Sequence, residues 1–560
     1  MGVPSEESTS PTVLSTPTPT KTPKTRAFYL SFAAISVTTF LAALDLAAVA
    51  NVLPTISEAL HDESGDYLWV GSAYSLSSTA VIPLTGNFAN AFGRRPVMLS
   101  SIGLFAIGSA LAGAAQNMSM LIAARTIQGV LAFFEVRHWQ VLTHKGVGGG
   151  GILTLSEILV ADLVPLSERG IYAGLVALVW ALASGGALAS TGTKTWRWLF
   201  YLNLPICGLS ALIVIFYLSV RTPEGTIRSK LAKIDWVGNA IIVSGATLAI
   251  LGLTWGGSRY PWSSAKVLAP LVIGFVLVAA FFVFEATVPA DPTIPRDVVS
   301  NRTSLVAILE TAAHGVATIT LIYYFVAFFQ AVKGATPLRA AVDFLPASFL
   351  TTPSAFAGGI IITVTKKYRV VNWVGWIVII VAFALLSTVT SAGVTQATLY
   401  GYQVLAAVGI GILFGGPMFP LLAPLPPNRA AAALSLFTFT RSFSNTWGIA
   451  IGGTILQNEL TKRLPAEFLA MFPAGSDIAY SSIPTIRTLP EPLRGQVQDA
   501  FAASLAIIWR VMAGICGAGL VVSLFMKELP LATAVDESYA LQEKEEKEKP
   551  ASAAETNTAV

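Results

Sequence analysis

Long apolar segments separated by short polar stretches make up most of this chain. There are fourteen, centred near residues 40, 80, 106, 128 joined to 152, 180, 208, 245, 277, 315, 352, 380, 408, 443 and 514. A helix needs about 20 mainly apolar residues to cross the hydrocarbon core of a bilayer. The pattern therefore predicts an all-α polytopic membrane protein with fourteen transmembrane helices.

The composition supports a membrane protein and argues against several other classes. Hydrophobic residues make up 54% of the 560 residues and charged residues 12%, and the mean hydropathy is +0.67. Cys207 and Cys516 both lie in apolar runs, so we expect small core residues rather than a disulfide framework or a metal cluster. A formal net charge of +4 does not indicate a nucleic-acid surface. The expected surrounding is the lipid bilayer.

The basic residues gather on one side when the fourteen segments are threaded alternately. This side carries Arg94, Arg95, Arg169, the 221–233 cluster, Arg296, Arg302, Lys366, Lys367, Arg369 and Arg429. By the positive-inside rule it is the cytosolic side, and both termini lie there. Residues 1–26 are rich in Ser, Thr and Pro and predict a disordered cytosolic tail, and 531–560 form a charged cytosolic tail.

An internal repeat divides the chain into two halves. Gly86 lies eight residues before Arg94, and Gly358 lies eight residues before Lys366. The later loops PLSERG and PLPPNRA also match. We predict a first six-helix half at 27–219 and a second at 304–530. A cytosolic loop and two linking helices in 220–303 join them. In such parallel-repeat transporters the substrate path runs between the halves, near the midplane.

Several motifs carry a resemblance to a known family. They are LAALDLAAVANVLP around Asp45, WVGSAYSLSSTAVIPLTGNFANAFGRRP, RTIQG from Arg125, EILVADLVPLSERG, WRWLFYLNLP, LTWGGSRYPWSS, YYFVAFFQAVKG and FTRSFSNTWGIAIGG. Over nearly all of 27–527 the chain resembles the major facilitator superfamily, and within it the fourteen-helix drug:proton antiporters that include fungal toxin efflux pumps. The resemblance implies the major facilitator fold and proton-coupled efflux of amphipathic small molecules such as secondary metabolites, toxins or drugs.

The resemblance also implies a cytosolic gate in two loops. Its residues here are Gly86, Asn90, Gly93, Arg94 and Arg95 after the second helix, and Asp162, Glu168 and Arg169 after the fourth. The family has an acidic residue where this chain has Asn90. That departure argues against a gate locked by charge.

Charged side chains within the first half are functional candidates, because charge in a membrane is costly. Asp45 is the one acid of a long apolar run and could bind a proton, bind a cationic substrate or make a helix-packing hydrogen bond. Arg125 matches the arginine that the family uses in proton coupling, and Gln128 follows in the same motif. The alternative for Arg125 is a structural ion pair.

The second half offers a comparable set of polar residues. Glu310 and His314 are four residues apart and so share a helix face, where the carboxylate could hold a proton beside the imidazole. Arg441 and Asn445 repeat that spacing and are expected to face the same central cavity. The remaining candidates are aromatic or polar residues that suit either a planar apolar substrate or the membrane interface: Tyr323, Tyr324 and Gln330.

The fourth helix contains a segment foreign to its surroundings. In the family RTIQG and one apolar residue run directly into the glycines, but here Leu131 to Val147 intervene. A cytosolic elaboration with two histidines as a pH sensor is one interpretation. A metal site from His138 and His144 is a second, disfavoured because six residues do not place them on one helix face. We favour a third, a translated intron. If the segment is made, we expect Arg125 to lose its register, and 148–160 to be too short to cross the membrane.

The fifth helix is shorter than its counterpart in the second half. Arg169 lies sixteen residues before Gly185, whereas Arg429 lies twenty-three residues before Gly452. Seven residues are missing, or about 10 Å of helix. The family places a glycine-proline antiporter motif here, and WALASGGALAS contains no proline. We expect a run that barely spans the membrane.

The sequence predicts a secondary transporter. It has no G-x-x-x-x-G-K-[ST] loop, so we expect no cofactor and a proton gradient in place of ATP. We find no residues for an enzyme activity. The prediction is a monomeric proton-coupled exporter in the plasma membrane, with the vacuolar membrane as the alternative. A siderophore-type importer, and a non-transporting or inactive family member, are the other candidate functions.

Overall fold

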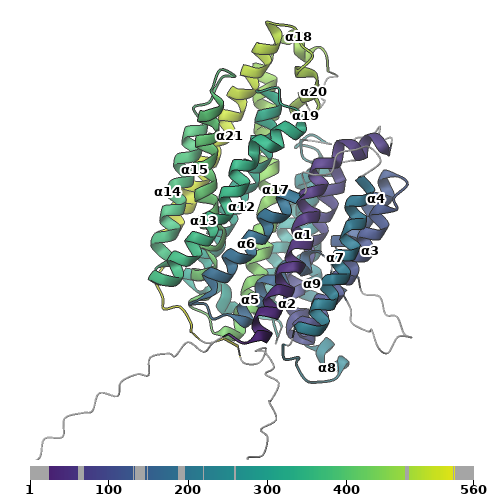
Figure 1. The fold of residues 1–560 in the computed structure, drawn as a ribbon, viewed down its shortest axis with the longest axis vertical. Helices are drawn as coiled ribbons and strands as arrows, with labels where there is room; N and C mark the ends of the chain where they lie inside the picture. Colours follow the sequence, from purple (N-terminus) through teal and green to yellow (C-terminus); the bar gives the residue numbers. More distant parts are fainter. Residues whose placement is uncertain are drawn as a thin grey trace, which may run out of the picture.

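A computed structural model describes the helical body of the chain. The described residues are 24–60, 68–129, 131–132, 146–147, 149–186, 196–218, 220–257, 260–289, 291–472, 478–533 and 535–536. Nearly all of them lie in helices that run along one another in a bundle (Figure 1). The prediction of an all-α polytopic membrane protein is confirmed.

The helices follow one another in the order that the hydrophobic pattern predicts. The first half contains α1 (Arg26–Ala59), α2 (Leu68–Phe92), α3 (Arg94–Gly113), α4 (Met118–Gly129), α5 (Gly149–Leu163), α6 (Arg169–Gly186) and α7 (Trp196–Tyr217). The linking region contains α8 (Ile227–Ala232), α9 (Trp236–Trp255) and α10 (Ala265–Thr287). Two short strands, β1 (Leu131–Ala132) and β2 (Gly146–Val147), lie between α4 and α5.

The second half has longer helices. It contains α11 (Arg296–Ser300), α12 (Arg302–Ala331), α13 (Pro337–Thr365), α14 (Tyr368–Leu386), α15 (Gln396–Gly415), α16 (Met418–Leu422), α17 (Ala430–Arg463) and α21 (Leu493–Ser523). A 3-10 turn (Pro427–Arg429) and the short helices α18 (Ala466–Leu469), α19 (Ile478–Ser481) and α20 (Ile483–Ile486) complete it.

Local sequence sets where several helices begin and end. Asn301 accepts hydrogen bonds from the backbone of Thr303 and Ser304 at the start of α12, and Thr336 caps α13 in the same way. Between α2 and α3 the chain turns at Gly93, whose φ of 91° favours glycine. The turns are therefore encoded beside the apolar runs that they join.

All fourteen predicted segments fall on helices, with the fourth divided between α4 and α5. Ten helices among the described residues are long and apolar enough to cross a membrane. α7 and α10 expose large apolar side chains such as Trp198, Phe216 and Val283, which suits contact with lipid. The number of fourteen crossings stays a prediction.

The insertion leaves the fourth helix in place on both sides. Gly129 at the end of α4 and Gly150 at the start of α5 both pack against Ser78 of α2, so the two helices continue one another along α2. Leu131 pairs with Val147 in the β1–β2 ladder and closes the segment at its base. Both α4 and α5 pack against α2 and α3. The expectation that 148–160 is too short to cross the membrane stays a prediction. His138 and His144 lie outside the described residues.

The described part of the fifth predicted helix is α6, which has 18 residues up to Gly186, about 27 Å at 1.5 Å per residue. Its counterpart α17 has 34 residues. The expectation of a run that barely spans the membrane stays a prediction. Residues 187–195, which complete the sequence where the family has its glycine-proline motif, lie outside the described residues.

The two halves touch through α6 with α13 and through α2 and α5 with α17. Gly170 of α6 meets Gly359 of α13, and Gly86 of α2 meets Ser435 of α17. These contacts lie toward the predicted cytosolic end of the bundle, where α2 ends and α6 begins (Figure 1). The Lys366 ammonium also donates to the Ser167 carbonyl across the halves, at 2.7 Å. The described contacts therefore hold the halves together at that end.

Candidate functional site

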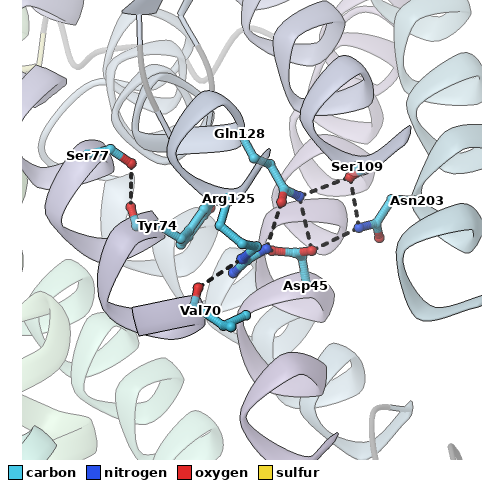
Figure 2. A network of polar contacts seen from close by, with 8 residues as sticks. All are labelled: Asp45, Val70, Tyr74, Ser77, Ser109, Arg125, Gln128 and Asn203. Atoms are coloured by element: carbon cyan, nitrogen blue, oxygen red, sulfur yellow. Dashed lines mark hydrogen bonds and ion pairs between the residues drawn. The ribbon is translucent and has the colours of Figure 1, made fainter. Parts of the chain in front are cut away.

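A buried ion pair joins α1 and α4 in the first half. The Arg125 Nη1 atom lies 2.6 Å from the Asp45 carboxylate (Figure 2), and both side chains are at most 1% exposed. The Arg125 Nε also donates to the Val70 carbonyl of α2, at 3.2 Å. The guanidinium lies over the Tyr74 ring, 4.4 Å from its centroid. Every charged atom in this pair thus meets an opposite charge, a hydrogen-bond acceptor or an aromatic face.

Three uncharged polar side chains complete the network. Gln128 accepts from Arg125 at 2.7 Å and donates to Asp45 at 3.0 Å and to Ser109 at 2.9 Å. Asn203 donates to Asp45 at 2.9 Å and to Ser109 at 3.2 Å. Helices α1, α2, α3, α4 and α7 therefore each contribute to one polar network around the Asp45 carboxylate (Figure 2).

This network decides between two interpretations of Arg125 only in part. Arg125 is paired, as its structural interpretation requires, and its partner is the second candidate, Asp45. The sequence weighed the two residues separately. It missed Ser109, Asn203 and Tyr74, although Asn203 stands out as an amide within the apolar run WRWLFYLNLP. Arg125 contacts Asp45 with the insertion present, and the loss of the register that points Arg125 at the cavity stays a prediction.

A second buried pair lies at the predicted cytosolic end. Arg94 donates to Asp162 from Nε at 2.7 Å and from Nη2 at 3.4 Å, and both side chains are at most 3% exposed. Its Nη1 donates to the carbonyl of Ala89 and to the side-chain oxygen of Asn90, at 2.9 and 3.1 Å. The departure at Asn90 was expected to weaken the case for a charge-locked gate, and that call stays a prediction. Arg94 has its charge partner in Asp162, and Asn90 supplies an uncharged acceptor.

The other gate candidates hold the loops around this pair. Gly86 packs against α17, and Gly93 provides the turn into α3. Arg169 is buried and donates to the carbonyls of Ala161 and Val164 at the end of α5. The two remaining candidates lie further out: Arg95 donates to the Ile215 carbonyl, and Glu168 pairs with Lys24 at 3.3 Å.

Glu310 and His314 share the buried face of α12, as their spacing predicts. Their partners differ, however. Glu310 Oε1 accepts from the Trp376 indole of α14 at 2.9 Å, and its Oε2 has no hydrogen-bond partner among the described residues. The His314 Nε2 lies 3.0 Å from the Ile410 carbonyl and 3.2 Å from the Thr318 hydroxyl.

The aromatic candidates of α12 point in different directions. Tyr323 is 45% exposed, and Gln330 is partly buried. Tyr324 is fully buried, donates to the Ile449 carbonyl at 2.6 Å, and places its ring against Gly452 of α17. Tyr324 therefore packs α12 against α17 within the second half.

Arg441 and Asn445 lie near a cavity between the halves. The Arg441 guanidinium lies between the rings of Phe414 and Phe437, 4.4 Å from each centroid, and Asn445 donates to the Gly315 carbonyl of α12 at 3.1 Å. Phe414 and Phe437 line the cavity together with residues of α5, α6 and α13. The sequence missed one lining residue, Glu157, although it is an acid within the apolar part of EILVADL.

No group of three or more His, Cys, Asp and Glu side chains that could hold a metal ion occurs in the described ranges. Cys207 and Cys516 are free and buried, as predicted.

A fold of two helical halves with buried charges and a cavity between them suggests a transporter, and comparison with known proteins identifies the family. The family model of the fungal trichothecene efflux pump (TRI12) matches residues 18–397. The chain belongs to this family. It is therefore a membrane transporter and not an enzyme.

Similar proteins cover nearly the whole chain. The efflux pump FUS6 of Gibberella fujikuroi is 36% identical over 546 residues, which cover 94% of this chain and 94% of the relative. The MFS-type efflux pump LUC4 of a Fusarium species is 36% identical over 536 residues, 92% of this chain and 91% of the relative. The MFS-type transporter of the acurin A biosynthesis cluster of Aspergillus aculeatus is 34% identical over 531 residues, 92% of each chain.

Two solved structures share the fold. The human organic anion transporter MFSD10 (TETRAN) superposes with a TM-score of 0.55 at 16% identity, covering 89% of this chain and 99% of its own. The proton:xylose symporter XylE superposes with a TM-score of 0.53 at 13% identity, covering 85% and 98%. These two likenesses support the major facilitator fold and nothing finer.

Proposed function

We propose that the chain is a proton-coupled exporter of amphipathic small molecules, such as the secondary metabolites of a fungus. The observation that carries the proton coupling is the buried Asp45–Arg125 pair with its polar neighbours, at 2.6 Å between α1 and α4. Burying two charges costs several kcal/mol each, so a well-packed apolar pair would serve stability as well or better. A transporter that moves protons has a use for such a carboxylate.

Protonation gives the pair two states. With Asp45 ionised, its carboxylate accepts from Arg125, Gln128 and Asn203 and holds α1, α4 and α7 together. A proton on Asp45 cancels the charge that balances Arg125. Arg125 then turns toward its remaining acceptors, the carbonyl of Val70 and the amide of Gln128. This change weakens the contact between α1 and α4. In this way protonation of Asp45 is coupled to the rocking of the two halves.

Export is supported by the names of the relatives, which include efflux pumps and a transporter of a biosynthesis cluster. The cavity between the halves has Phe414, Phe419 and Phe437 on its wall, so the surface between the halves is aromatic there. The positive-inside rule places both termini in the cytosol, and the plasma membrane is the membrane across which export is useful. The working unit in this proposal is the monomer.

Reconstituted vesicles test the proposal. An imposed pH gradient, acidic inside, is followed with a trapped pH-sensitive dye while rhodamine 6G, Nile red or carboxyfluorescein is added outside. We expect at least one dye to accumulate inside as the gradient dissipates, and an ionophore to abolish both effects. In vesicles loaded with the same dye, movement of dye out together with protons would instead favour an importer. No movement with any dye, with or without residues 131–147, would favour the inactive family member.

A matched pair of variants tests the network itself. Arg125→Ala removes the charge that balances Asp45 and should abolish coupled dye movement. Arg197→Ala is the control, because it removes an arginine that donates to the Ala115 carbonyl and lies over the Trp196 ring, outside the Asp45 network. Full transport by Arg125→Ala would remove this residue from the mechanism.

A further inference from the structure

Glu157 is an acid at the interface of the two halves. It lies on α5, partly exposed, and lines the cavity that α5 and α6 share with α13, α15, α16 and α17. No hydrogen bond or ion pair ties its carboxylate to another of the described residues. Asp45, by contrast, is 1% exposed and held by three donors. In this conformation Glu157 is the acid that a proton from the cavity can reach.

The second half supplies a cation that acts on Glu157. Arg441 of α17 and Glu157 of α5 attract each other electrostatically across the interface. Residues of the second half hold the Arg441 guanidinium. Its Nη2 donates to the Phe414 carbonyl at 2.5 Å, and the rings of Phe414 and Phe437 lie against it. Its buried Nε has no hydrogen-bond partner among the described residues. The cation is thus fixed in place with a donor still free.

The other charged group that acts on Glu157 is Arg169, at the start of α6 in the same half. Arg169 is occupied by the carbonyls of Ala161 and Val164 and is also attracted by Asp162. Helices α1, α2 and α3, which also pack on α5, contribute no described charged group that acts on Glu157. The attraction that crosses from one half to the other is therefore that of Arg441.

We propose that Glu157 is a proton-exchanging residue that controls the closure of the predicted cytosolic end, with Arg441 of the opposite half as its charge partner. This inference rests on the proposed function as a proton-coupled exporter and adds a specific acid at the interface. Its place is suitable, because the cavity is lined by Gly170 and Gly359, whose contact closes this end, and by α17, which carries the Gly86–Ser435 contact.

The proposed cycle balances one proton against one substrate. The ionised Glu157 carboxylate attracts Arg441 and holds the halves together at the cytosolic end. A proton that enters from the outside through the cavity binds to a carboxylate oxygen and cancels the attraction, so this end opens. The proton leaves to the cytosol, where its activity is lower, and the substrate enters the cavity. The restored attraction then closes the cytosolic end behind the substrate, which departs to the outside.

Spin labels at the cytosolic end test this proposal without a substrate. Glu224→Cys and Lys367→Cys place one label beside each half at exposed positions, and the native Cys207 and Cys516 are buried and do not compete. The full chain in lipid nanodiscs is measured by double electron–electron resonance between about pH 8 and about pH 5. We expect the population with the long distance between labels, relative to the population with the short distance, to rise by about tenfold on acidification.

Substitutions at the pair separate its role from general stability. Glu157→Gln copies the protonated state and should give the long distance at every pH, and Glu157→Asp should restore the pH response. Arg441→Gln should give the long distance too, with no further change in the double variant. Glu459→Gln is the matched control, because it removes a carboxylate from the far end of α17, where its partners are Lys462 and Arg463.

Two outcomes would overturn the inference: distances in the parent that do not change with pH, or a pH response that persists in Glu157→Gln. A response that depends on Glu157 in a chain that moves no dye would leave the inference standing, and would contradict the proposed export instead.

Discussion

Gly170 of α6 and Gly359 of α13 touch backbone to backbone where the two halves meet. A Cβ atom added to Gly359 would lie 2.8 Å from the carbonyl carbon and 3.0 Å from the Cα of Gly170. Real Cβ atoms do not approach a backbone so closely, and neither backbone can move aside without separating α6 from α13. The crossing therefore requires glycine on both sides.

Gly359→Ala should weaken the closed state of the cytosolic end. Overpacking of a close contact costs about 1–3 kcal/mol, which corresponds to a shift of roughly tenfold or more toward the open state. We expect slower export and a longer distance between the labels at positions 224 and 367. Gly103→Ala is the control, since a Cβ there meets nothing within 4 Å. Equal distances in both variants would show that the crossing does not limit closure.

The Asp45–Arg125 network should behave as a unit. Arg125→Ala leaves a buried carboxylate without its countercharge, which typically costs about 3–5 kcal/mol. Asp45→Asn combined with Arg125→Gln removes both charges and should recover most of this stability, as measured by thermal unfolding in detergent. The double variant should still not export. Recovery of export together with stability would mean that the pair only holds the helices together.

Loss of either of two ion pairs at the predicted cytosolic end should lower the free energy of unfolding, but by different amounts. Asp162→Asn leaves Arg94, which is 2% exposed, beside a neutral side chain, and we expect a loss of about 3–5 kcal/mol. Asp297→Asn breaks a pair with Arg429 in which both side chains are more than 40% exposed, and the loss should be under about 1 kcal/mol. The midpoints of thermal unfolding compare the two directly. Similar midpoints would show that water reaches Arg94.

The hydrophobic pattern predicted the helices well because each crossing must be apolar over its own length, which is a local property. Contacts between helices are not local. Asp45 and Arg125 are far apart in the chain, so their pairing depends on how α1 and α4 rotate against each other. Glu310 and His314 shared a face as predicted, but Trp376, which binds Glu310, comes from α14. The spacing of residues within α12 contains no information on α14.

Two further residues show what a family pattern leaves out. Asn90 stands where the family has an acid, and its substitution suggested a gate without charge. The acid that Arg94 uses is Asp162, from a helix that follows only after the insertion. Glu157 was overlooked although it is an acid within an apolar run, and its significance comes from Arg441 on the other half. Only the packing of α5 against α17 brings this pair together.

The insertion in the fourth helix provides the last prediction. Mature transcripts should join Gly129-Val130 directly to Gly148, which gives RTIQGVGGGGILTL. Because Gly129 and Gly150 already pack against Ser78 along α2, a chain without Leu131–Val147 can continue α4 into α5 as one helix. We expect that chain to export at least as well as the chain with the insertion, since both keep Asp45 beside Arg125.

The register of α5 makes this prediction sharp. Each residue turns a helix by about 100°, so a deletion of 131–146 that leaves Val147 in place would rotate α5 against α4 by that amount. Asp162 would then turn away from Arg94, and Ser156 from Thr39, its partner at 3.0 Å on α1. We expect this variant to unfold at a lower temperature and to lose export. Removal of 131–147 should preserve both the unfolding temperature and export. Equal stability and export of the two deletions, or transcripts that retain the segment, would show that the insertion is a natural part of the protein and that α4 and α5 are positioned independently.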